Sequence, residues 1–283
     1  MITSIIRIIA LIFAIGISTT NVKAQDIIYE NADSIFIEKI ARKHYYEKHK
    51  ATGERVAAIA KEFIGNSYIA ETLDKYENEP LFISCSKLDC TTFVELVLAI
   101  ATTKESCFID ICRTLEQIRY RNGVRNGYTS RLHYISWWIS DAAKQNIIEE
   151  IRTQQHTATQ KLNLNFMSTH PESYRHLKEN EQYIQEIATM EKPFYGVDVR
   201  YIPKSNIQDI GKNDIKDGDI IAIVTAIEGL DVSHIGFAHW SNNKLHMIHA
   251  SSSVGKVIND TTSLNEYLAK RKNHLGIRVF RAL

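Results

Sequence analysis

The chain has 283 residues, 24% of them charged, and a formal net charge of +1 at pH 7. This near-neutral balance, without a dense basic run, excludes the usual electrostatic footprint of a nucleic-acid-binding protein. The length suits one large globular domain or two small ones.

Residues 1–24 have the pattern of a secretory signal peptide. Arg7 supplies the positive region, residues 8–17 are apolar but too few to span a bilayer, and Ala24 marks a cleavage point before Gln25. The alternative is a membrane anchor, against which the short apolar run argues. We therefore expect an exported protein, periplasmic or secreted, with no stable membrane insertion after signal cleavage.

Hydrophobic periodicity predicts helices in most of the next 170 or so residues. The helical segments are 34–50, 54–64, 90–101, 109–120 and, with a break at 167–171, the polar stretch 145–192. Gly65 is a typical stop for the second of these helices, and residues 194–203 are expected to be extended. The scattered histidines of the polar stretch are interpreted as surface residues: His156, His170 and His176.

The helix predicted after Asp89 begins at or just after Cys90. Its apolar positions follow the spacing of one buried face: Phe93, Leu96, Val97 and Ile100. A thiol at a helix start lies beside unpaired N–H groups and the positive end of the helix dipole, which stabilise a thiolate. The same N–H groups can hold a developing oxyanion. The alternative is that Cys90 is a small core residue.

The densest aromatic stretch spans residues 131–142. One interpretation is a helix that buries Trp137 in the core. The other is a groove that holds a sugar or a peptide, because aromatic rings offer flat apolar contact and arginine a fixed fork of donors. The groove would use Arg131, His133, Tyr134, Trp137, Trp138 and Asp141.

The last third of the chain changes to strand patterns. The predicted strands are 219–225, 234–240, 244–250 and 276–281, with a helix at 264–272. Helices followed by antiparallel strands predict an α+β fold. Asn242 and Asn243 suit a two-residue hairpin turn, because Asn tolerates positive φ. In that register Ser241 pairs with Lys244, and Gly236 faces His249.

Four histidines of this hairpin fall into two pairs. Since side chains alternate along a strand, His234 shares one face with His249, whereas His239 and His246 share the other. The division between two faces argues against a common metal site, and no metal or other cofactor is expected. An odd loop length would bring His246 instead of His249 to the face of His234.

Cys90, His234 and His249 fit an activated nucleophile with its base and orienting group. His234 would take the thiol proton or form an ion pair with the thiolate, and His249 would fix the imidazole tautomer. The cysteine-before-histidine order is that of papain-like enzymes.

Three motifs resemble those of the NlpC-type cell-wall cysteine peptidases and amidases, which have a papain-like α+β fold. They are Asp-Cys-Thr-Thr-Phe-Val at 89–94, Ser-His-Ile-Gly-Phe at 233–237 and Ile-His-Ala-Ser at 248–251. A strand opener at 218–221 and a Gly-x-x-Tyr at 65–68 fit the same pattern. The resemblance covers the chain from about residue 55 to the C-terminus and implies one catalytic domain at 25–283, with an inserted segment around 122–200.

The extended cysteine motif and the Arg-Leu-His-Tyr-x-x-Trp-Trp segment resemble the N-acetylmuramoyl-L-alanine amidase-like branch, once known only as a domain of unknown function. This resemblance implies cleavage of the amide between N-acetylmuramic acid and L-alanine, with small or anhydro muropeptides preferred. Cys90, His234 and His249 would be catalytic. The predicted substrate-binding residues are Tyr68, Asp89, Arg131, His133, Tyr134, Trp137 and Ser233.

Three alternative functions remain open: a γ-D-glutamyl-diamino acid endopeptidase of the same fold, a non-catalytic muropeptide-binding protein, and a toxin aimed at other cells' walls. The four cysteines do not form a disulfide framework. A Cys107–Cys112 bridge is disfavoured because the two would point apart on a helix, and a Cys85–Cys90 bridge would silence or regulate the thiol.

Overall fold

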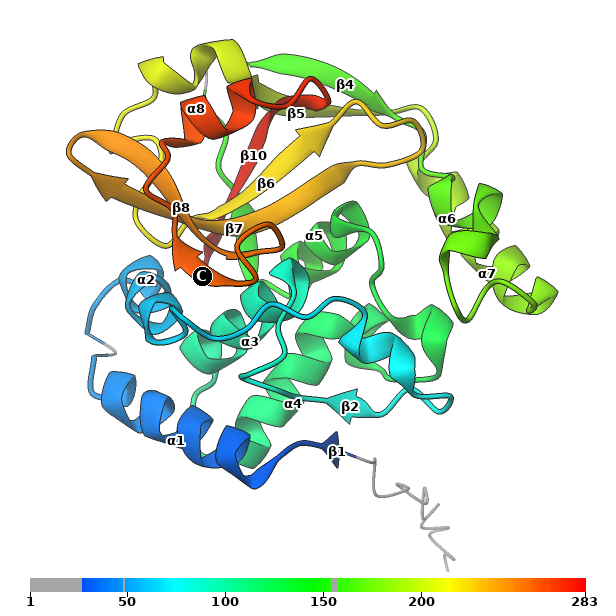
Figure 1. The fold of residues 1–283 in the computed structure, drawn as a ribbon, viewed down its shortest axis with the longest axis horizontal. Coiled ribbons are helices and arrows are strands. Elements are labelled where there is room, and N and C mark those ends of the chain that lie inside the picture. Colours follow the sequence, from blue (N-terminus) through cyan, green and yellow to red (C-terminus); the bar gives the residue numbers. More distant parts are fainter. Residues whose placement is uncertain (1–26, 48, 154–156) are drawn as a thin grey trace, which may run out of the picture.

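The computed structural model describes residues 27–283 apart from 48 and 154–156, and it has the expected α+β architecture (Figure 1). The predicted signal peptide, residues 1–24, and His156 lie outside the described residues. In the part of the chain that the structure describes, no helix is long and apolar enough to cross a membrane.

The centre of the fold is an eight-stranded sheet in the order β4-β5-β10-β6-β7-β8-β9, with β3 paired to β10. Its strands are β3 (Ile148–Glu150), β4 (Ala158–Leu162), β5 (Val197–Pro203), β6 (Ile220–Thr225), β7 (Val232–Ser241), β8 (Lys244–Ser251), β9 (Lys256–Asn259) and β10 (His274–Ala282). Every pair in this sheet is antiparallel. A separate parallel pair joins β1 (Ile27–Ile28) to β2 (Leu81–Phe82).

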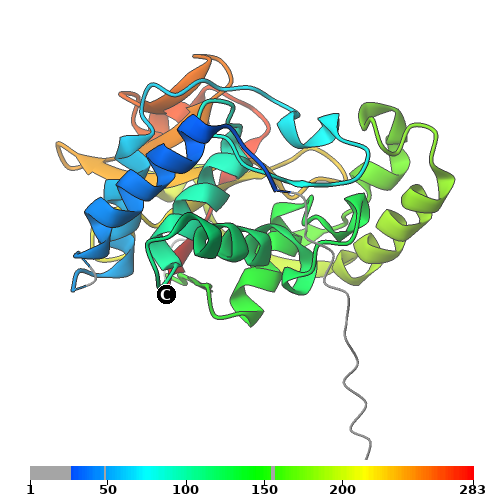
Figure 2. The ribbon, with the colours of Figure 1, turned by 90° about the horizontal axis from the view of Figure 1, so that it is seen from below.

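Helices cover both faces of the sheet (Figures 1 and 2). The elements are α1 (Asn31–Tyr45), α2 (Thr52–Glu62), α3 (Cys90–Thr102), α4 (Phe108–Arg119), α5 (Ile135–Lys144), α6 (Phe166–Thr169), α7 (Glu181–Glu191) and α8 (Leu264–Ala269). The larger core lies between the sheet and α1 to α5, and its centre is α3, which is buried along most of its length. A smaller core lies on the opposite face beneath α8. α6 and α7 project at the end of the molecule away from α1 and α2.

The hairpin of β7 and β8 has the predicted register. Ser241 pairs with Lys244 and His239 with His246. The turn residues Asn242 and Asn243 have φ of 49° and 58°, as a tight hairpin with this twist requires.

The prediction of helix throughout 145–192 is wrong for two segments. Residues 148–150 and 158–162 are the strands β3 and β4, whose exposed positions carry polar side chains. β4 is an edge strand, so its hydrogen bonds come from a distant partner, β5, which local composition does not reveal. The short strand β9 was also not predicted.

All four cysteines are free. Neither of the disulfides considered from the sequence is therefore formed. Cys107 is exposed just before α4, whereas Cys112 is buried within that helix, which agrees with the expectation that the two point apart.

Candidate active site

Cys90 is the first residue of α3, as the sequence predicted. Its position is fixed by a reciprocal cap: Asp89 Oδ1 accepts a hydrogen bond from the Thr92 amide at 2.8 Å, and the Thr92 hydroxyl accepts one from the Asp89 amide at 2.9 Å. Asp89 was predicted to bind substrate. The structure instead engages its carboxylate in holding the helix start that carries the thiol.

His234 on β7 and His249 on β8 are brought together by the hairpin. His234 Nε2 lies 2.7 Å from His249 Nδ1, and the rings meet edge to face. Gly236 makes room for this pair, because a Cβ built there would lie 2.8 Å from the Cβ of His249. His246 lies on the other face and contacts the backbone carbonyls of Asp260 and Thr262.

A carboxylate completes the chain of contacts behind His249. Its Nε2 lies 3.4 Å from Oδ2 of Asp260, the residue that follows β9. Because a carboxylate accepts, the network assigns the His249 proton to Nε2 and leaves its Nδ1 to accept from Nε2–H of His234. Nδ1 of His234 is then unprotonated and able to act as a base.

Cys90 and His234 line one cavity of about 180 Å³. Burial raises the pKa of the Cys90 thiol to about 12 and lowers the pKa of His234 to about 3. The neighbouring groups His249, His274 and Arg271 lower the pKa of His234 further, because any positive charge on them disfavours a charged imidazole. At neutral pH the resting pair is therefore a thiol and a neutral imidazole, and the ion pair considered from the sequence is not the resting state.

An aromatic side chain covers the histidine pair. The Tyr267 ring, from α8, lies 6.4 Å from the His234 ring and 5.8 Å from the His249 ring. On its far side it stacks on His274 of β10 at 5.8 Å. This packing helps to hold both imidazoles in orientation.

Three predicted substrate-binding residues also line the cavity: His133, Tyr134 and Ser233. The His133 ring is fixed by its Nε2, which is 2.9 Å from the Tyr128 carbonyl. The Tyr134 hydroxyl donates to Glu191 at 2.7 Å and accepts from the Met167 amide at 2.8 Å. Both side chains are thus held rigidly at the cavity wall.

Arg131 and Trp137 do not line this cavity, which corrects the groove interpretation for both. The Arg131 fork is buried and binds two carboxylates, with Nη2 2.7 Å from Glu79 and Nη1 2.7 Å from Asp74. Only 1% of Trp137 is exposed, so the core interpretation holds for this residue.

Tyr68 is half-buried and lies outside the lining of the cavity. Burial raises the pKa of its hydroxyl, and the neighbouring charges of Cys90 and Asp89 raise it further. Its backbone forms an isolated β-bridge with Leu88, two residues before Cys90, so it lies near the start of α3.

Sequence reasoning missed two carboxylates of the site. Asp260 follows a strand that was not predicted, so nothing placed it beside His249. Asp231 lines the cavity and is buried, where its carboxylate accepts hydrogen bonds from the Ser136 and Val232 amides. An aspartate just before a strand most often signals a turn, which hides such a role.

The fold and the site define an α+β protein in which a thiol at a helix start and an imidazole on an antiparallel sheet share one cavity. No cluster of three or more metal-binding side chains occurs among the described residues. A model of the N-acetylmuramoyl-L-alanine amidase-like (AmiA-like) family matches residues 58–277, and the chain belongs to this family.

Solved structures of similar proteins agree with this family assignment. An N-acetylmuramoyl-L-alanine amidase from Bacteroides uniformis is 35% identical, with a TM-score of 0.79 over 82% of this chain and 99% of that one. A Bacteroides fragilis protein with a provisional xylanase name is 44% identical, with a TM-score of 0.76 over 79% and 99% of the two chains. A Legionella pneumophila protein, 23% identical over 88% and 97% with a TM-score of 0.64, shares the fold. No curated protein sequence matches.

Proposed function

We propose that this protein is a cysteine-dependent amidase that cleaves the bond between N-acetylmuramic acid and L-alanine in small peptidoglycan fragments. The observation that carries the proposal is the geometry of Cys90, His234, His249 and Asp260, which supplies a nucleophile, a base and two orienting groups. Family membership supports a peptidoglycan amidase-like role, and the Bacteroides uniformis relative bears the name of this activity.

The reaction follows from the protonation states. Nδ1 of His234 takes the Cys90 proton as the sulfur attacks the lactyl carbonyl, and the Cys90 backbone N–H stabilises the oxyanion. The imidazolium then gives this proton to the departing amine of L-alanine, which leaves a thioester. Water attacks the thioester while His234 accepts its proton, and this proton returns to the sulfur as the sugar acid is released.

Two other reactions fit the site less well. A xylanase activity, as the provisional name of one relative suggests, would require a pair of carboxyl groups flanking a glycosidic bond. The catalytic cavity has one carboxylate in its lining, Asp231, already engaged by backbone amides. Cleavage between γ-D-glutamate and the diamino acid uses the same thiol chemistry and is the second candidate, which the amidase-like family disfavours.

The deciding experiment is mass spectrometry of a defined disaccharide–tripeptide after incubation with the mature chain, with Cys90→Ala as control. Release of the whole peptide supports the amidase proposal. Release of the diamino acid alone would mean that the second candidate is right. No cleavage by the wild-type protein would favour a muropeptide-binding protein without catalysis.

The proposal also includes export to the periplasm or beyond, because residues 1–24 have the pattern of a signal peptide. Cell fractionation of the full chain, followed by N-terminal sequencing of the mature protein, tests this. Recovery of an uncleaved chain in the cytoplasm would contradict it.

A further inference from the structure

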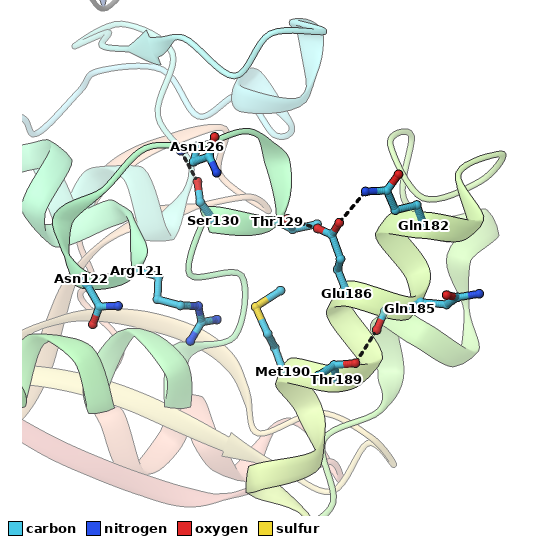
Figure 3. A pocket seen from close by; sticks show the side chains of 10 residues that line it. All are labelled: Arg121, Asn122, Asn126, Thr129, Ser130, Gln182, Gln185, Glu186, Thr189 and Met190. Carbon is cyan, nitrogen blue, oxygen red and sulfur yellow. Dashed lines mark hydrogen bonds between the residues drawn. The ribbon is translucent and has the colours of Figure 1, made fainter. Parts of the chain in front are cut away.

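A second, larger cavity lies between helix α7 and the loop that follows α4 (Figure 3). Its volume is about 540 Å³, compared with 180 Å³ for the catalytic cavity. Of the ten residues that line it, only Met190 is apolar. A cavity of this size and polarity suits a ligand rich in hydrogen-bonding groups.

Helix α7 forms one wall with a polar face. Gln182, Gln185, Glu186 and Thr189 follow helical spacing on this side, whereas Ile187 on the other side is buried. Glu186 accepts hydrogen bonds from Thr129 at 2.6 Å and from Gln182 at 2.9 Å, both drawn in Figure 3. The Thr129 bond connects the two walls and keeps the cavity in shape.

The opposite wall carries Arg121. Figure 3 shows its guanidinium extending towards Met190 on α7. The group lies over the Trp137 ring, with Cζ 5.0 Å from the ring centroid. Its Nε and Nη2 are shielded from solvent and have no hydrogen-bond partner, and no ion pair joins the side chain to any other described residue.

Two more deeply buried arginines nearby are both paired. Arg119 binds Glu95 at 2.7 Å, and Arg131 binds Asp74 and Glu79, each at 2.7 Å. Burial lowers the pKa of Arg121, and the charge of Asp141 opposes this only in part. The Asp141 carboxylate hydrogen-bonds instead to the Asn122 amide and to Gln145.

A partly desolvated cation without an ionic partner is costly, and arginine is the side chain best suited to recognise a carboxylate. Because Arg121 lines the cavity, an anionic group of a ligand bound there would supply the ionic partner that this side chain lacks. The surrounding amides and hydroxyls would bind the hydroxyl or amide groups of the same ligand. One wall separates this cavity from the catalytic one: Tyr134 lines the latter, and its ring lies 4.8 Å from that of Trp137, beneath Arg121.

We propose that the Arg121 cavity is a second binding site, which holds a carboxylate-bearing part of a muropeptide that is not being cut. The ligand assignment rests on the proposed function. The carboxylate is either one of those of the stem peptide or the lactyl carboxylate of an N-acetylmuramic acid whose peptide has already been removed. Occupation of this site anchors the enzyme to peptidoglycan material while Cys90 acts on another bond.

The test is calorimetry on the mature Cys90→Ala chain, which binds without turnover. The probes are N-acetylmuramic acid, the stem tripeptide, and N-acetylglucosamine as the sugar that lacks a carboxylate. One of the acidic probes binds, and Arg121→Gln weakens that binding tenfold or more, the range for a hydrogen bond to a charged group. Arg113→Gln, which removes the same charge from an exposed arginine, leaves it unchanged.

A second pair of variants covers the case in which Arg121→Gln fails to fold. Thr189 is exposed at the rim on α7, so Thr189→Glu and Thr189→Gln differ only in charge. Thr189→Glu weakens binding by repelling the carboxylate, and Thr189→Gln does not. Three results would overturn the inference. Neither acidic probe binds, N-acetylglucosamine binds equally well, or binding is unchanged in both Arg121→Gln and Thr189→Glu.

The binding experiment and the cleavage experiment can fail separately. If the wild-type chain hydrolyses muropeptides but Arg121-dependent binding is absent, the second site alone is refuted. If binding depends on Arg121 but the wild-type chain cleaves nothing, the proposed function is refuted and the site stands.

Discussion

At the scale of single residues, the site rests as a neutral thiol beside a neutral imidazole. Burial outweighs the helix-start stabilisation of a thiolate at Cys90, and it also disfavours the imidazolium of His234. The nucleophile is therefore formed during attack rather than before it. This distinguishes the site from one with a preformed thiolate–imidazolium pair.

This resting state predicts how Cys90 reacts with iodoacetamide. Since the thiolate is the reactive form, the alkylation rate of the free enzyme rises with pH through the neutral and alkaline range. The rate is measured by mass spectrometry of the Cys90 peptide, with exposed Cys107 in the same sample as the reference. A plateau from about pH 5 to 8, the signature of an ion pair, would contradict the prediction.

Asp260 provides a second prediction. Asp260→Asn removes the charge that fixes the His249 tautomer, so kcat falls about 10- to 100-fold, the range seen for carboxylates that orient metal-bound histidines, while KM changes little. The control is Asp198→Asn, which alters an exposed aspartate on β5. Steady-state kinetics on the muropeptide measure both parameters. An unchanged kcat in Asp260→Asn would show that His249 is oriented without it.

The sequence could identify Cys90, His234 and His249, because each lies in a local pattern whose geometry is calculable. It could not place Arg131 or Trp137. An arginine and a tryptophan in an aromatic segment suit a groove as well as a core. For Arg131 the partners that decide, Asp74 and Glu79, are more than fifty residues away in sequence.

At the scale of elements, the sequence predicted those strands whose pairing is determined by residues nearby in the chain. The β7–β8 hairpin was predicted to the register, because an Asn-Asn turn and alternating side chains determine it within twenty residues. β4 and β9 are exposed along much of their length and depend on partners elsewhere in the sheet. Nothing in their own residues distinguishes them from polar loop or helix.

The close approach of the two strands at Gly236 predicts a sensitive position. Gly236→Ala would place a Cβ 2.8 Å from the Cβ of His249 and 2.9 Å from the Ile248 carbonyl, so β8 and the His249 ring must shift. Overpacking of this kind costs about 1–3 kcal/mol of stability, and displacement of His249 lowers kcat.

Chemical denaturation measures this loss, together with kcat. Gly211→Ala is the matched control, because its nearest neighbour, Asp214 Oδ2, is at 3.9 Å and leaves ordinary room for a methyl group. A Gly236→Ala variant as stable and active as Gly211→Ala would show that the strand pair is not so closely set.

At the scale of the whole molecule, the catalytic cavity is formed by segments far apart in the chain. The start of α3, the loop before α5, the α6 region and the start of β7 all contribute to its lining. Their convergence depends on how the helices cover one face of the sheet (Figure 1). The family resemblance could suggest this arrangement, but no local pattern contains it.

The burial of His234 makes the stability of the whole fold depend on pH. The pKa of His234 is about 3 in the folded state and about 6.5 when unfolded. Between these values the unfolded chain binds a proton that the native state does not, so the free energy of unfolding rises with pH. Stability is therefore lost as pH falls from 6.5 towards 3. The pKa values of His133 and His249 are lowered in the same direction, mainly by burial, and add to the effect.

His234→Gln isolates one part of this dependence. Urea unfolding at several pH values between 3 and 6.5 gives the slope of the unfolding free energy, which falls by up to about 1.4 kcal/mol per pH unit in this variant, the value for one proton. The control is His170→Gln, which makes the same substitution at an exposed histidine outside the lining of the catalytic cavity. If His234→Gln keeps the wild-type slope, folding does not lower the pKa of His234, and the resting state of a desolvated, neutral imidazole beside a thiol is wrong.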